Sequence, residues 1–489
     1  MRRIVFVEPE SPNLDIFSRF ALPRLGSIIL ATMMRDRGWE ASVVAEELVK
    51  LDLDTLRTAD LVAISTITST APHAYAIADA LRERNLTVIM GGPHVTELPD
   101  EALEHADFVV RGEGEEALMR FVDAWEGGRD YTHVPNLSYL RAGVAVHNVL
   151  GGVSTPLDDL PFPDFGLLEG GLRSIAGMRT IPVQTSRGCP FDCSFCSVTG
   201  MFGRSYRYRS TENVIEELSR YNEPGNFIFF YDDNFTASPA RTKALLAAMI
   251  AEGFTFRWST QVRADVARDE ELVELMRRAG CHTVFVGFES VNPESLAEMN
   301  KRQSVEEIDQ AIRVLRRHRI NIHGMFVHGF DEDDWSAVER SVRFAKQARL
   351  TSCQFLILTP LPGTRFYREM VEAGRLRNRD WSLYDSHHVV FAPKHLSAPE
   401  LQWAQIYSHK RLYSAAATMG RLLRGKLVSF TLSIYARRMN RAWQRKNAPY
   451  LAAIGLIGSS LRELLRSDLR ERIRRRLSGS VAEAASSGS

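Results

Sequence analysis

Residues 187–196 have the sequence Arg-Gly-Cys-Pro-Phe-Asp-Cys-Ser-Phe-Cys and contain three of the five cysteines of the chain, Cys189, Cys193 and Cys196. Thiolates at a C-x-x-x-C-x-x-C spacing can bind one soft metal site. A structural zinc site closes its shell with four protein ligands, and an iron–sulfur cube also normally takes four cysteines. Three cysteines therefore indicate a cluster with one iron open to a small ligand. The alternatives are a zinc site completed by a distant histidine, or three unrelated thiols.

The residues around the cysteines favour the cluster. Residues 181–186 are typical of a buried strand, Gly188 and Pro190 indicate a turn, and Phe191 and Phe195 supply aromatic packing. This strand and loop resemble the radical SAM superfamily. The resemblance implies a four-iron four-sulfur cluster on the three cysteines, at the first strand of a partial β/α barrel. It also implies S-adenosylmethionine (SAM) on the open iron, with Phe195 against its adenine.

The size and composition indicate a soluble protein of two or three domains. The chain has 489 residues, of which 45% are hydrophobic and 25% charged. We find no run of about 18 apolar residues, so we expect no transmembrane helix. Residues 1–9 contain too short an apolar run for a signal peptide and are expected to form a first strand. Five cysteines, three of them clustered, favour a reducing, cytoplasmic location.

Charge is unevenly distributed along the chain. From Ala404 onward lie 17 of the 61 Lys and Arg residues but only 4 of the 60 Asp and Glu residues. An acidic body therefore carries a basic tail, although the net charge of the whole chain is only +1.

Residues 1–126 alternate strand and helix patterns. Strands are expected at 4–7, 41–44, 61–65, 87–90 and 108–110, and helices at 25–37, 71–84 and 115–125. This alternation predicts an α/β domain with a doubly wound, Rossmann-like parallel sheet. Ligands bind such sheets outside the carboxyl ends of the strands, here the loops 65–68, 91–94 and 111–115. The glycines of these loops are explained equally well by tight turns alone.

Residues 23–26, 91–94 and 112–116 resemble the cobalamin-binding domain that precedes the barrel in one large radical SAM class. The pattern Asp-x-His-x-x-Gly, whose histidine ligates cobalt, is absent, and we interpret His73 and His94 as structural. Cobalamin is commonly held without such a histidine in this class. The alternative is a domain that keeps the fold and binds nothing. The resemblance implies a cobalamin site formed by Ser65, Gly91, Gly92, Pro93, Gly112 and Glu113.

Residues 127–178 are expected to form a linker with a hairpin at 136–140 and 144–149. The alternation then resumes over 179–370. Its six strands are predicted at 181–186, 227–231, 255–261, 283–288, 321–327 and 352–358. Six strands with helices between them predict a partial (β/α)6 TIM barrel, whose functional groups lie at the carboxyl ends of the strands.

Polar residues follow three of these strands. The resemblance implies that Asp232 and Asp233 hold the amino group of SAM, that Gln261 and Arg263 contact the ligand and its carboxylate, and that Glu289 binds the ribose hydroxyls. The alternatives are a helix cap for the aspartates and a structural, hydrogen-bonded carboxylate for Glu289.

Residues 371–478 are expected to form a mostly helical, basic extension, followed by a disordered tail at 479–489. Tyr384, His387 and His388 either meet the substrate or cap the barrel opening. For the basic helices we consider three roles: covering the acidic body, lying on an anionic membrane surface, or binding nucleic acid, which is the least favoured.

Together these features predict a cobalamin-dependent radical SAM methyltransferase. It would act on an unactivated carbon of a small-molecule or lipid-like substrate through a 5′-deoxyadenosyl radical, with electrons from an external flavodoxin or ferredoxin. A cyclase or rearrangement enzyme of the same class is the alternative. A tRNA-modifying methylthiotransferase is disfavoured, because such enzymes carry three further cysteines before the loop and none precedes Cys189 here.

Overall fold

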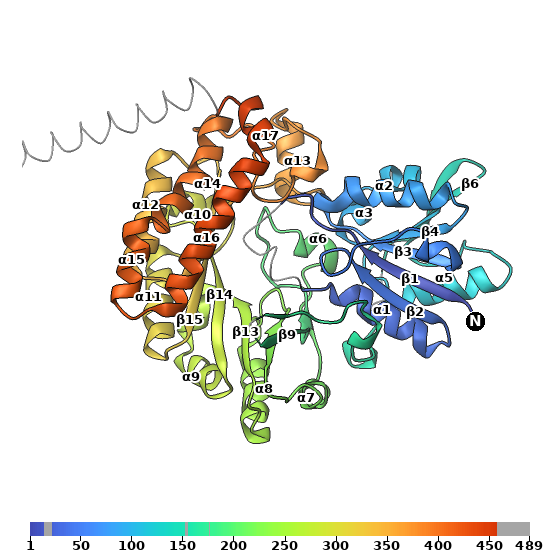
Figure 1. Cartoon of the computed structure of the whole chain (residues 1–489), viewed down its shortest axis with the longest axis horizontal. Helices are drawn as coiled ribbons and strands as arrows, with labels where there is room; N and C mark the ends of the chain where they lie inside the picture. The colour runs from blue at the N-terminus through green and yellow to red at the C-terminus, as the bar shows by residue number, and fades with distance from the viewer. Residues whose placement is uncertain (14–21, 152–154, 176, 457–489) are drawn as a thin grey trace, which may run out of the picture.

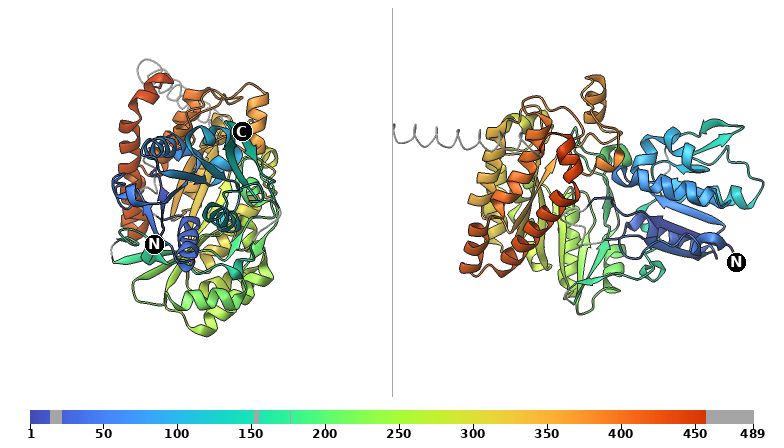
Figure 2. Two further views of the ribbon diagram at one scale, coloured as in Figure 1. Left: turned by 90° about the vertical axis from the view of Figure 1, so that its right-hand side faces the viewer. Right: turned by 45° about the horizontal axis from the view of Figure 1, so that its top comes forward.

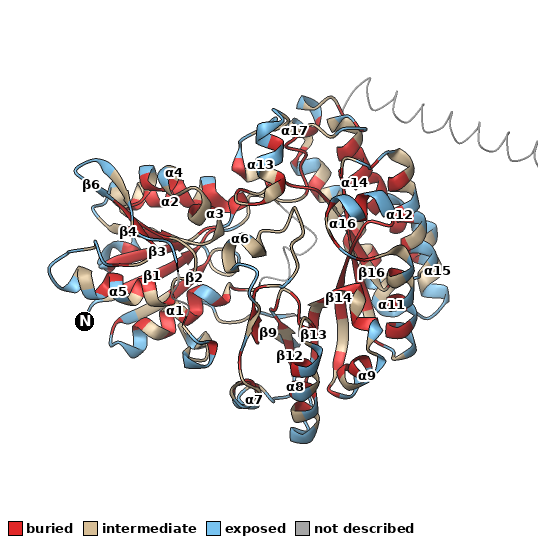
Figure 3. Cartoon of the chain, turned by 180° about the vertical axis from the view of Figure 1, so that it is seen from behind, coloured by how far each residue is buried: buried red, intermediate tan, exposed pale blue. Residues whose placement is uncertain are grey.

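The computed structural model describes residues 1–13, 22–151, 155–175 and 177–456 (Figure 1). Two parallel sheets lie side by side, one in the N-terminal part of the chain and one in the middle. A layer of C-terminal helices packs on the second sheet, at the end away from the first (Figures 1 and 2). Helices pack on both faces of the first sheet and on the outer face of the second, and most strand residues of both sheets are buried (Figure 3). The α/β class with two parallel sheets and a helical extension is confirmed.

The first sheet is doubly wound, as predicted. Its parallel strands are arranged in the order β2-β1-β3-β4-β5. They are β1 (Arg3–Glu8), β2 (Glu40–Ala45), β3 (Leu61–Ser65), β4 (Thr87–Gly91) and β5 (Phe108–Val110). Helices α1 (Leu25–Asp36) and α5 (Glu115–Glu126) contribute to the hydrophobic core of one face. Helices α2 (Ala71–Arg82), α3 (Pro93–Glu97) and α4 (Pro99–His105) contribute to the core of the other.

The hairpin expected in the linker forms, but it belongs to this sheet. Strand β6 (Leu137–Arg141) pairs antiparallel with β5, and β7 (Val144–His147) pairs antiparallel with β6. The sheet therefore continues to His147, past the boundary that we expected at residue 126, because the edge of β5 provides hydrogen-bonding groups that a free hairpin would lack.

The second sheet is a partial barrel. Its six parallel strands are β9 (Met178–Val183), β12 (Asn226–Phe230), β13 (Arg257–Val262), β14 (Cys281–Glu289), β15 (Asn321–His328) and β16 (Ser352–Ile357), with β8 (Ser174–Ile175) antiparallel at one edge. The connecting helices are α7 (Thr211–Ser219), α8 (Pro239–Glu252), α9 (Glu270–Arg278), α10 (Pro293–Glu298), α11 (Val305–Arg317) and α12 (Trp335–Gln347). The predicted six-stranded partial barrel is confirmed.

Short elements complete the chain. They are β10 (Ser186–Arg187), α6 (Val198–Phe202), β11 (Arg207–Tyr208) and α13 (Arg365–Glu372), and the 3-10 turns η1 (Thr55–Thr58), η2 (Thr68–Thr70), η3 (Leu157–Asp159), η4 (Phe165–Leu167), η5 (Ala264–Arg268) and η6 (Trp381–Leu383). None of the described helices is long and apolar enough to cross a membrane.

C-terminal helices cover the open edge of the barrel at β16. They are α14 (Ala398–Leu412), α15 (Ala415–Leu423), α16 (Leu427–Lys446) and α17 (Ala448–Ala453). The buried hydroxyl of Tyr413 accepts a hydrogen bond from the backbone N–H of Cys353 at 2.8 Å and donates one to its carbonyl at 2.7 Å. The outward-facing backbone groups of Cys353 in the edge strand β16 are thereby hydrogen-bonded and shielded from solvent and from other chains. The expected tail at 479–489 and the helical pattern beyond residue 456 lie outside the described residues.

We predict that Tyr413→Phe lowers the free energy of unfolding by about 1–3 kcal/mol, because it leaves two buried backbone groups of Cys353 without their partner. Urea unfolding followed by tryptophan fluorescence measures the change. The matched control is Tyr208→Phe, since Tyr208 is 51% exposed. Equal midpoints for Tyr413→Phe and the wild type would contradict this role of the hydroxyl.

Candidate active site

The cysteine loop is anchored to the barrel by Asp232. This fully buried carboxylate accepts hydrogen bonds from the backbone N–H groups of Thr185 (2.7 Å) and Ser186 (3.0 Å) and from the Thr185 hydroxyl (2.5 Å). The Arg241 guanidinium donates to the same hydroxyl at 2.8 Å. Burial raises the pKa of Asp232, while these hydrogen bonds oppose the increase. With both oxygens engaged, Asp232 positions the chain just before the loop, and Asp233 is the aspartate that faces a cavity.

The far side of the loop is held by the opposite half of the barrel. Met299 accepts a hydrogen bond from the Ser194 N–H at 3.2 Å, and Phe366 donates to the Ser194 carbonyl at 3.0 Å. Asn300 and Arg365 both donate to the carbonyl of Asp192, at 3.0 and 3.1 Å. The loop is thus fixed by β9 at one end and by segments after β14 and β16 at the other.

The three loop cysteines are half-buried free thiols. Burial raises the pKa of Cys189, and it raises the pKa of Cys196 to about 12. Within the described part of the chain, no group of three or more His, Cys, Asp or Glu side chains is arranged to hold a single metal ion. Cysteines that ligate a cube each bind a different iron and need not converge on one point. The donor set therefore fits a cluster better than a zinc ion.

Asp233 lies beside the cysteines and lines the cavity between the two sheets. Burial and the neighbouring Asp232 raise the pKa of Asp233 to about 7, and a hydrogen bond from the Gly188 backbone opposes this. A carboxylate destabilised in this way gains from a nearby positive charge. Asp233 is therefore suited to receive an ammonium group.

The other residues expected to bind SAM lie at the ends of β13 and β14. Gln261 is the second-last residue of β13. Arg263 follows the end of β13 and stacks on the Phe191 ring, with 3.7 Å from its guanidinium carbon to the ring centroid. Glu289 ends β14 after a register shift and forms a buried ion pair with Lys301 at 2.8 Å. Its backbone φ of 59° is unusual for a non-glycine residue. Arg263 and Glu289 thus already have protein partners, and their contacts with SAM stay predictions.

Phe195 packs against the barrel core and meets Phe330, which follows β15, in an edge-to-face contact with 5.9 Å between ring centroids. This places its ring beside the cysteines at the carboxyl end of the barrel. An adenine contact from this position stays a prediction.

A cavity of about 450 Å³ lies between the carboxyl ends of the first sheet and the cysteine loop. One wall holds all six residues expected to bind cobalamin: Ser65, Gly91, Gly92, Pro93, Gly112 and Glu113. The opposite wall comes from the barrel and consists of Gln184, Arg187, Ser197, Val198, Met201, Phe202, Tyr231 and Asp233. The two domains thus enclose one space, which borders the cluster loop.

The first wall suits the face of a large ring. Gly92 has a φ of 110°, and a Cβ atom there would lie 2.4 Å from the carbonyl oxygen of Thr66. Only glycine therefore fits this turn, which brings backbone close to the cavity. The cavity surface is mostly apolar, with Leu25, Leu30 and Ile89 among its lining residues. Backbone and apolar side chains without a histidine ligand fit a corrin held by its faces and edges.

Arg187 joins the two walls. Its guanidinium donates to Glu115 at 2.6 Å and to Glu113 at 3.3 Å, and also to the side chain of Gln184 at 2.9 Å. Arg207 forms a second ion pair with Glu113. Burial lowers the pKa of Arg187, but the carboxylates of Glu115 and Glu113 raise it by more. The residue before the cysteine loop is thus ion-paired to the glycine-rich loop of the first domain.

The structure does not bring Tyr384, His387 and His388 to this cavity. Tyr384 donates its hydroxyl to the carbonyl of Asn378 at 2.6 Å. The fully buried His388 ring is hydrogen-bonded to Asp385 (2.9 Å) and Asn447 (3.0 Å). His387 is buried, and its ring Nδ1 lies 2.9 Å from the carbonyl oxygen of Asp385. These contacts hold the C-terminal segment in place, and the two expected roles of these residues, meeting the substrate or capping the barrel opening, stay predictions.

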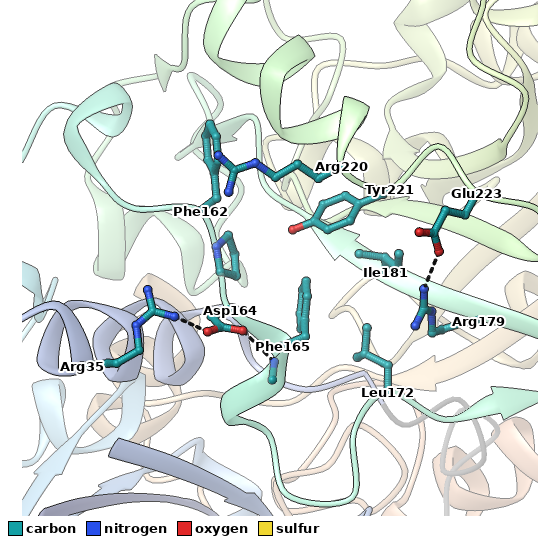
Figure 4. A pocket seen from close by; sticks show the side chains of 12 residues that line it. Arg35, Phe162, Asp164, Phe165, Leu172, Arg179, Ile181, Arg220, Tyr221 and Glu223 are labelled. Atoms are coloured by element: carbon teal, nitrogen blue, oxygen red, sulfur yellow. Dashed lines mark hydrogen bonds and ion pairs between the residues drawn. The ribbon is translucent and has the colours of Figure 1, made fainter. Parts of the chain in front are cut away.

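A second cavity, of about 420 Å³, lies where the linker meets the amino end of β9 (Figure 4). Phe162, Phe165 and Tyr221 line it. Arg35 pairs with Asp164 and Arg179 with Glu223, while Arg220 lies over the Phe162 ring. It faces away from the cysteines, which follow the other end of β9, so we place no reaction there.

Two family models match the chain. The radical SAM superfamily matches residues 183–345, and the B12 binding domain matches residues 18–122. The chain is also 32% identical over 392 residues to an uncharacterized methyltransferase of Pyrococcus horikoshii, covering 78% of this chain and 85% of that protein.

The chain belongs to the radical SAM superfamily.

It is of the class that carries a B12 binding domain before the barrel, so an iron–sulfur cluster, SAM and cobalamin are its cofactors. It is 28% identical over 450 residues to the bacteriochlorophyllide d C-12(1)-methyltransferase of Chlorobaculum tepidum, covering 90% of this chain and 94% of that protein. Its fold is similar to that of the cobalamin-dependent SAM radical enzyme OxsB, with a TM-score of 0.68 at 15% identity, over 97% of this chain and 81% of the other.

Several residues of this site were not predicted from the sequence. Arg187 is one of them, although a charged residue beside a buried strand needs a partner. Lys301 pairs with Glu289 from 12 residues away, and Arg24 donates to the Ser65 carbonyl at 2.5 Å. No local pattern marks Lys301. Arg24 is part of the Pro-Arg-Leu-Gly segment at residues 23–26, which resembles the cobalamin-binding domain. That resemblance could have identified Arg24 as a residue of the site.

We predict that Arg187→Met destabilises the fold by about 3–5 kcal/mol, because it leaves the buried carboxylate of Glu115 without its partner, whereas Glu113 keeps its ion pair with Arg207. The double variant Arg187→Met/Glu115→Gln should recover part of this loss. Urea unfolding of the cofactor-free chain measures both, with the exposed Arg204→Ala as control. Wild-type stability of the single variant, or no recovery in the double variant, would contradict the ion pair as the cause.

We predict that Asp233→Asn weakens SAM binding roughly 10- to 100-fold, the effect of losing one charge-assisted hydrogen bond. Anaerobic equilibrium dialysis of the cluster-loaded enzyme against labelled SAM measures it. Asp309→Asn, on the outer helix α11, is the control. Equal affinity of Asp233→Asn and the wild type would remove Asp233 from the SAM site.

Proposed function

We propose that this protein is a cobalamin-dependent radical SAM methyltransferase that methylates an unactivated carbon of a small-molecule substrate. One observation carries the proposal: a single cavity has the glycine-rich ends of the first sheet on one wall and the cluster loop, with Asp233, on the other. Reagents held on the two walls are close enough to act on one substrate. The methyltransferase relatives support methyl transfer as the outcome.

In this proposal the protein binds and orients the cofactors and the substrate, and the cofactors would supply the chemistry. When bound, the cluster and SAM would supply the radical chemistry that removes hydrogen from carbon, and cobalamin would supply the methyl group. Cys189, Cys193 and Cys196 would hold the cluster. Asp233 would hold the amino group of SAM, and Phe195 its adenine. Gln261, Arg263 and Glu289 would contact the rest of it.

On the other wall, Ser65, Gly91, Gly92, Pro93, Gly112 and Glu113 would hold cobalamin. Val198, Met201 and Phe202 from α6 line the cavity and would help to exclude water from the space between the bound cofactors. Exclusion of water protects a carbon radical from side reactions, so this apolar wall is as necessary as the ligands.

The substrate class and the partners are inferred from a relative and from the general chemistry of the chain. The Chlorobaculum relative is named for methylating a bacteriochlorophyllide, which supports a large, mostly apolar substrate for this chain. An external one-electron donor of flavodoxin or ferredoxin type would reduce the cluster. All five cysteines are free thiols, which supports a reducing compartment such as the cytoplasm. Contact with the inner face of a membrane through the C-terminal helices is also proposed.

Anaerobic reconstitution with iron, sulfide and hydroxocobalamin tests the proposal. We expect about four irons and one cobalt per chain. Incubation with SAM and dithionite should then give both 5′-deoxyadenosine and S-adenosylhomocysteine. S-adenosylhomocysteine is what remains when SAM loses its methyl group, whereas a cyclase or rearrangement enzyme need not form it. Its absence beside 5′-deoxyadenosine would contradict methyl transfer, and absence of cobalt would contradict the cobalamin site.

A pair of cysteine variants sharpens the test. Cys193→Ala should lose iron and 5′-deoxyadenosine formation but keep cobalt, since the first sheet does not depend on this thiol. Cys281→Ala should keep the iron, the cobalt and the formation of 5′-deoxyadenosine, because Cys281 is a buried thiol at the start of β14, away from the cysteine loop. Full iron content in Cys193→Ala would overturn the assignment of the cluster ligands.

A further inference from the structure

Exposed apolar side chains are concentrated where α15 turns into α16. Of the fifteen large apolar residues that are exposed in the described chain, five fall within residues 419–428. We call these five the apolar tip: Met419 (52% exposed), Leu422 (36%), Leu423 (81%), Leu427 (62%) and Val428 (58%). A cluster of exposed aliphatic side chains costs solubility and is typical of a surface that meets a partner or a membrane.

Positive charge surrounds the apolar tip. Arg424 and Lys426 lie in the turn itself, and Lys410 and Arg411 end the preceding helix, all four exposed. Between Glu400 and Glu463 the sequence contains eleven Lys and Arg residues but no Asp or Glu. Burial, and then repulsion from Arg411 and Arg421, lowers the pKa of Lys346 on the adjacent α12. The charges around the tip are therefore not neutralised by the body of the protein.

The place of the tip in the fold decides between possible partners. It lies at the end of the molecule farthest from the N-terminal domain (Figures 1 and 2). Tyr413, just before α15, contacts Cys353 at the amino-terminal part of β16, whereas the cysteine loop lies at the carboxyl ends of the strands. An acidic electron-transfer protein needs to approach the cluster, and here it could not. Aliphatic residues within a basic rim instead match the boundary between headgroups and acyl chains of an anionic bilayer.

We propose that the apolar tip docks the enzyme on an anionic lipid surface, with its aliphatic side chains among the acyl chains and its Arg and Lys residues on the headgroups. Docking at this end leaves the cavity between the two sheets directed away from the bilayer. The interaction therefore tethers the enzyme near membrane-associated substrates and does not deliver a lipid straight into the cavity. The proposal is independent of methyl transfer, since no residue of the tip touches the active site.

Flotation of the full-length chain with vesicles tests this surface. We expect binding to vesicles of 70% phosphatidylcholine and 30% phosphatidylglycerol at 50 mM salt, and at least tenfold weaker binding to pure phosphatidylcholine or at 500 mM salt. Leu423→Asp/Val428→Asp should weaken binding to the anionic vesicles at least tenfold. Arg424→Glu/Lys426→Glu should do the same, because it reverses the rim charge.

The matched control is Leu140→Asp/Val144→Asp, in exposed strands of the first sheet at the other end of the molecule. It should bind like the wild type. Residues 457–489 are the same in every variant, so differences report on the tip alone. Unchanged melting temperature and iron content show that the variants fold. Equal binding by the tip variants and the wild type would overturn the proposal, as would a dimer in solution that the tip variants convert to a monomer.

Discussion

The buried guanidinium of Arg187 is the contact on which the active site depends. It lies two residues before the first cysteine and is ion-paired to Glu113, in the loop that follows β5, and to Glu115, the first residue of α5. An arginine can reach two carboxylates at once because its planar fork has several donors. Neither domain could bury its own half of this contact alone, since an unpaired charge in the interior is costly. The ion pairs therefore fix where the cluster loop stands relative to the glycine-rich wall of the cavity.

Asp232 and Asp233 show how one sequence position can differ from the next in function. Both carboxylate oxygens of Asp232 accept hydrogen bonds from Thr185 and Ser186, and these bonds fix the path of the chain into the cysteine loop. Asp233 faces the cavity, and burial, together with the neighbouring Asp232, raises its pKa. The structural carboxylate thus adds to the effect of burial in favouring a cationic ligand at Asp233. Two like charges so close together are tolerated because Asp232 is compensated by hydrogen bonds and by Arg241.

Local pattern was enough to predict the two parallel sheets, because each strand is a short apolar run ended by glycine or a polar residue. It also predicted the cysteine loop and the six glycine-rich residues that prove to share one cavity wall. Pairings between distant residues could not be predicted. Arg187 meets carboxylates more than 70 residues away, and His388 meets Asn447, 59 residues away. The hairpin after residue 126 was recognised, but not its pairing with β5, since hydrogen bonds between strands leave no mark on composition.

The pattern Asp-x-His-x-x-Gly, whose histidine ligates cobalt, is absent from the sequence, and the cavity offers a corrin contacts of another kind. The first sheet provides one wall and the barrel the other, so a flat ring bound there would lose water from both faces. Burial of two apolar faces supplies free energy in proportion to area. A ligand bound in this way also stabilises the contact between the domains, because it binds only when they are together. Cofactor binding and domain docking are therefore one equilibrium, and Arg187 acts on both.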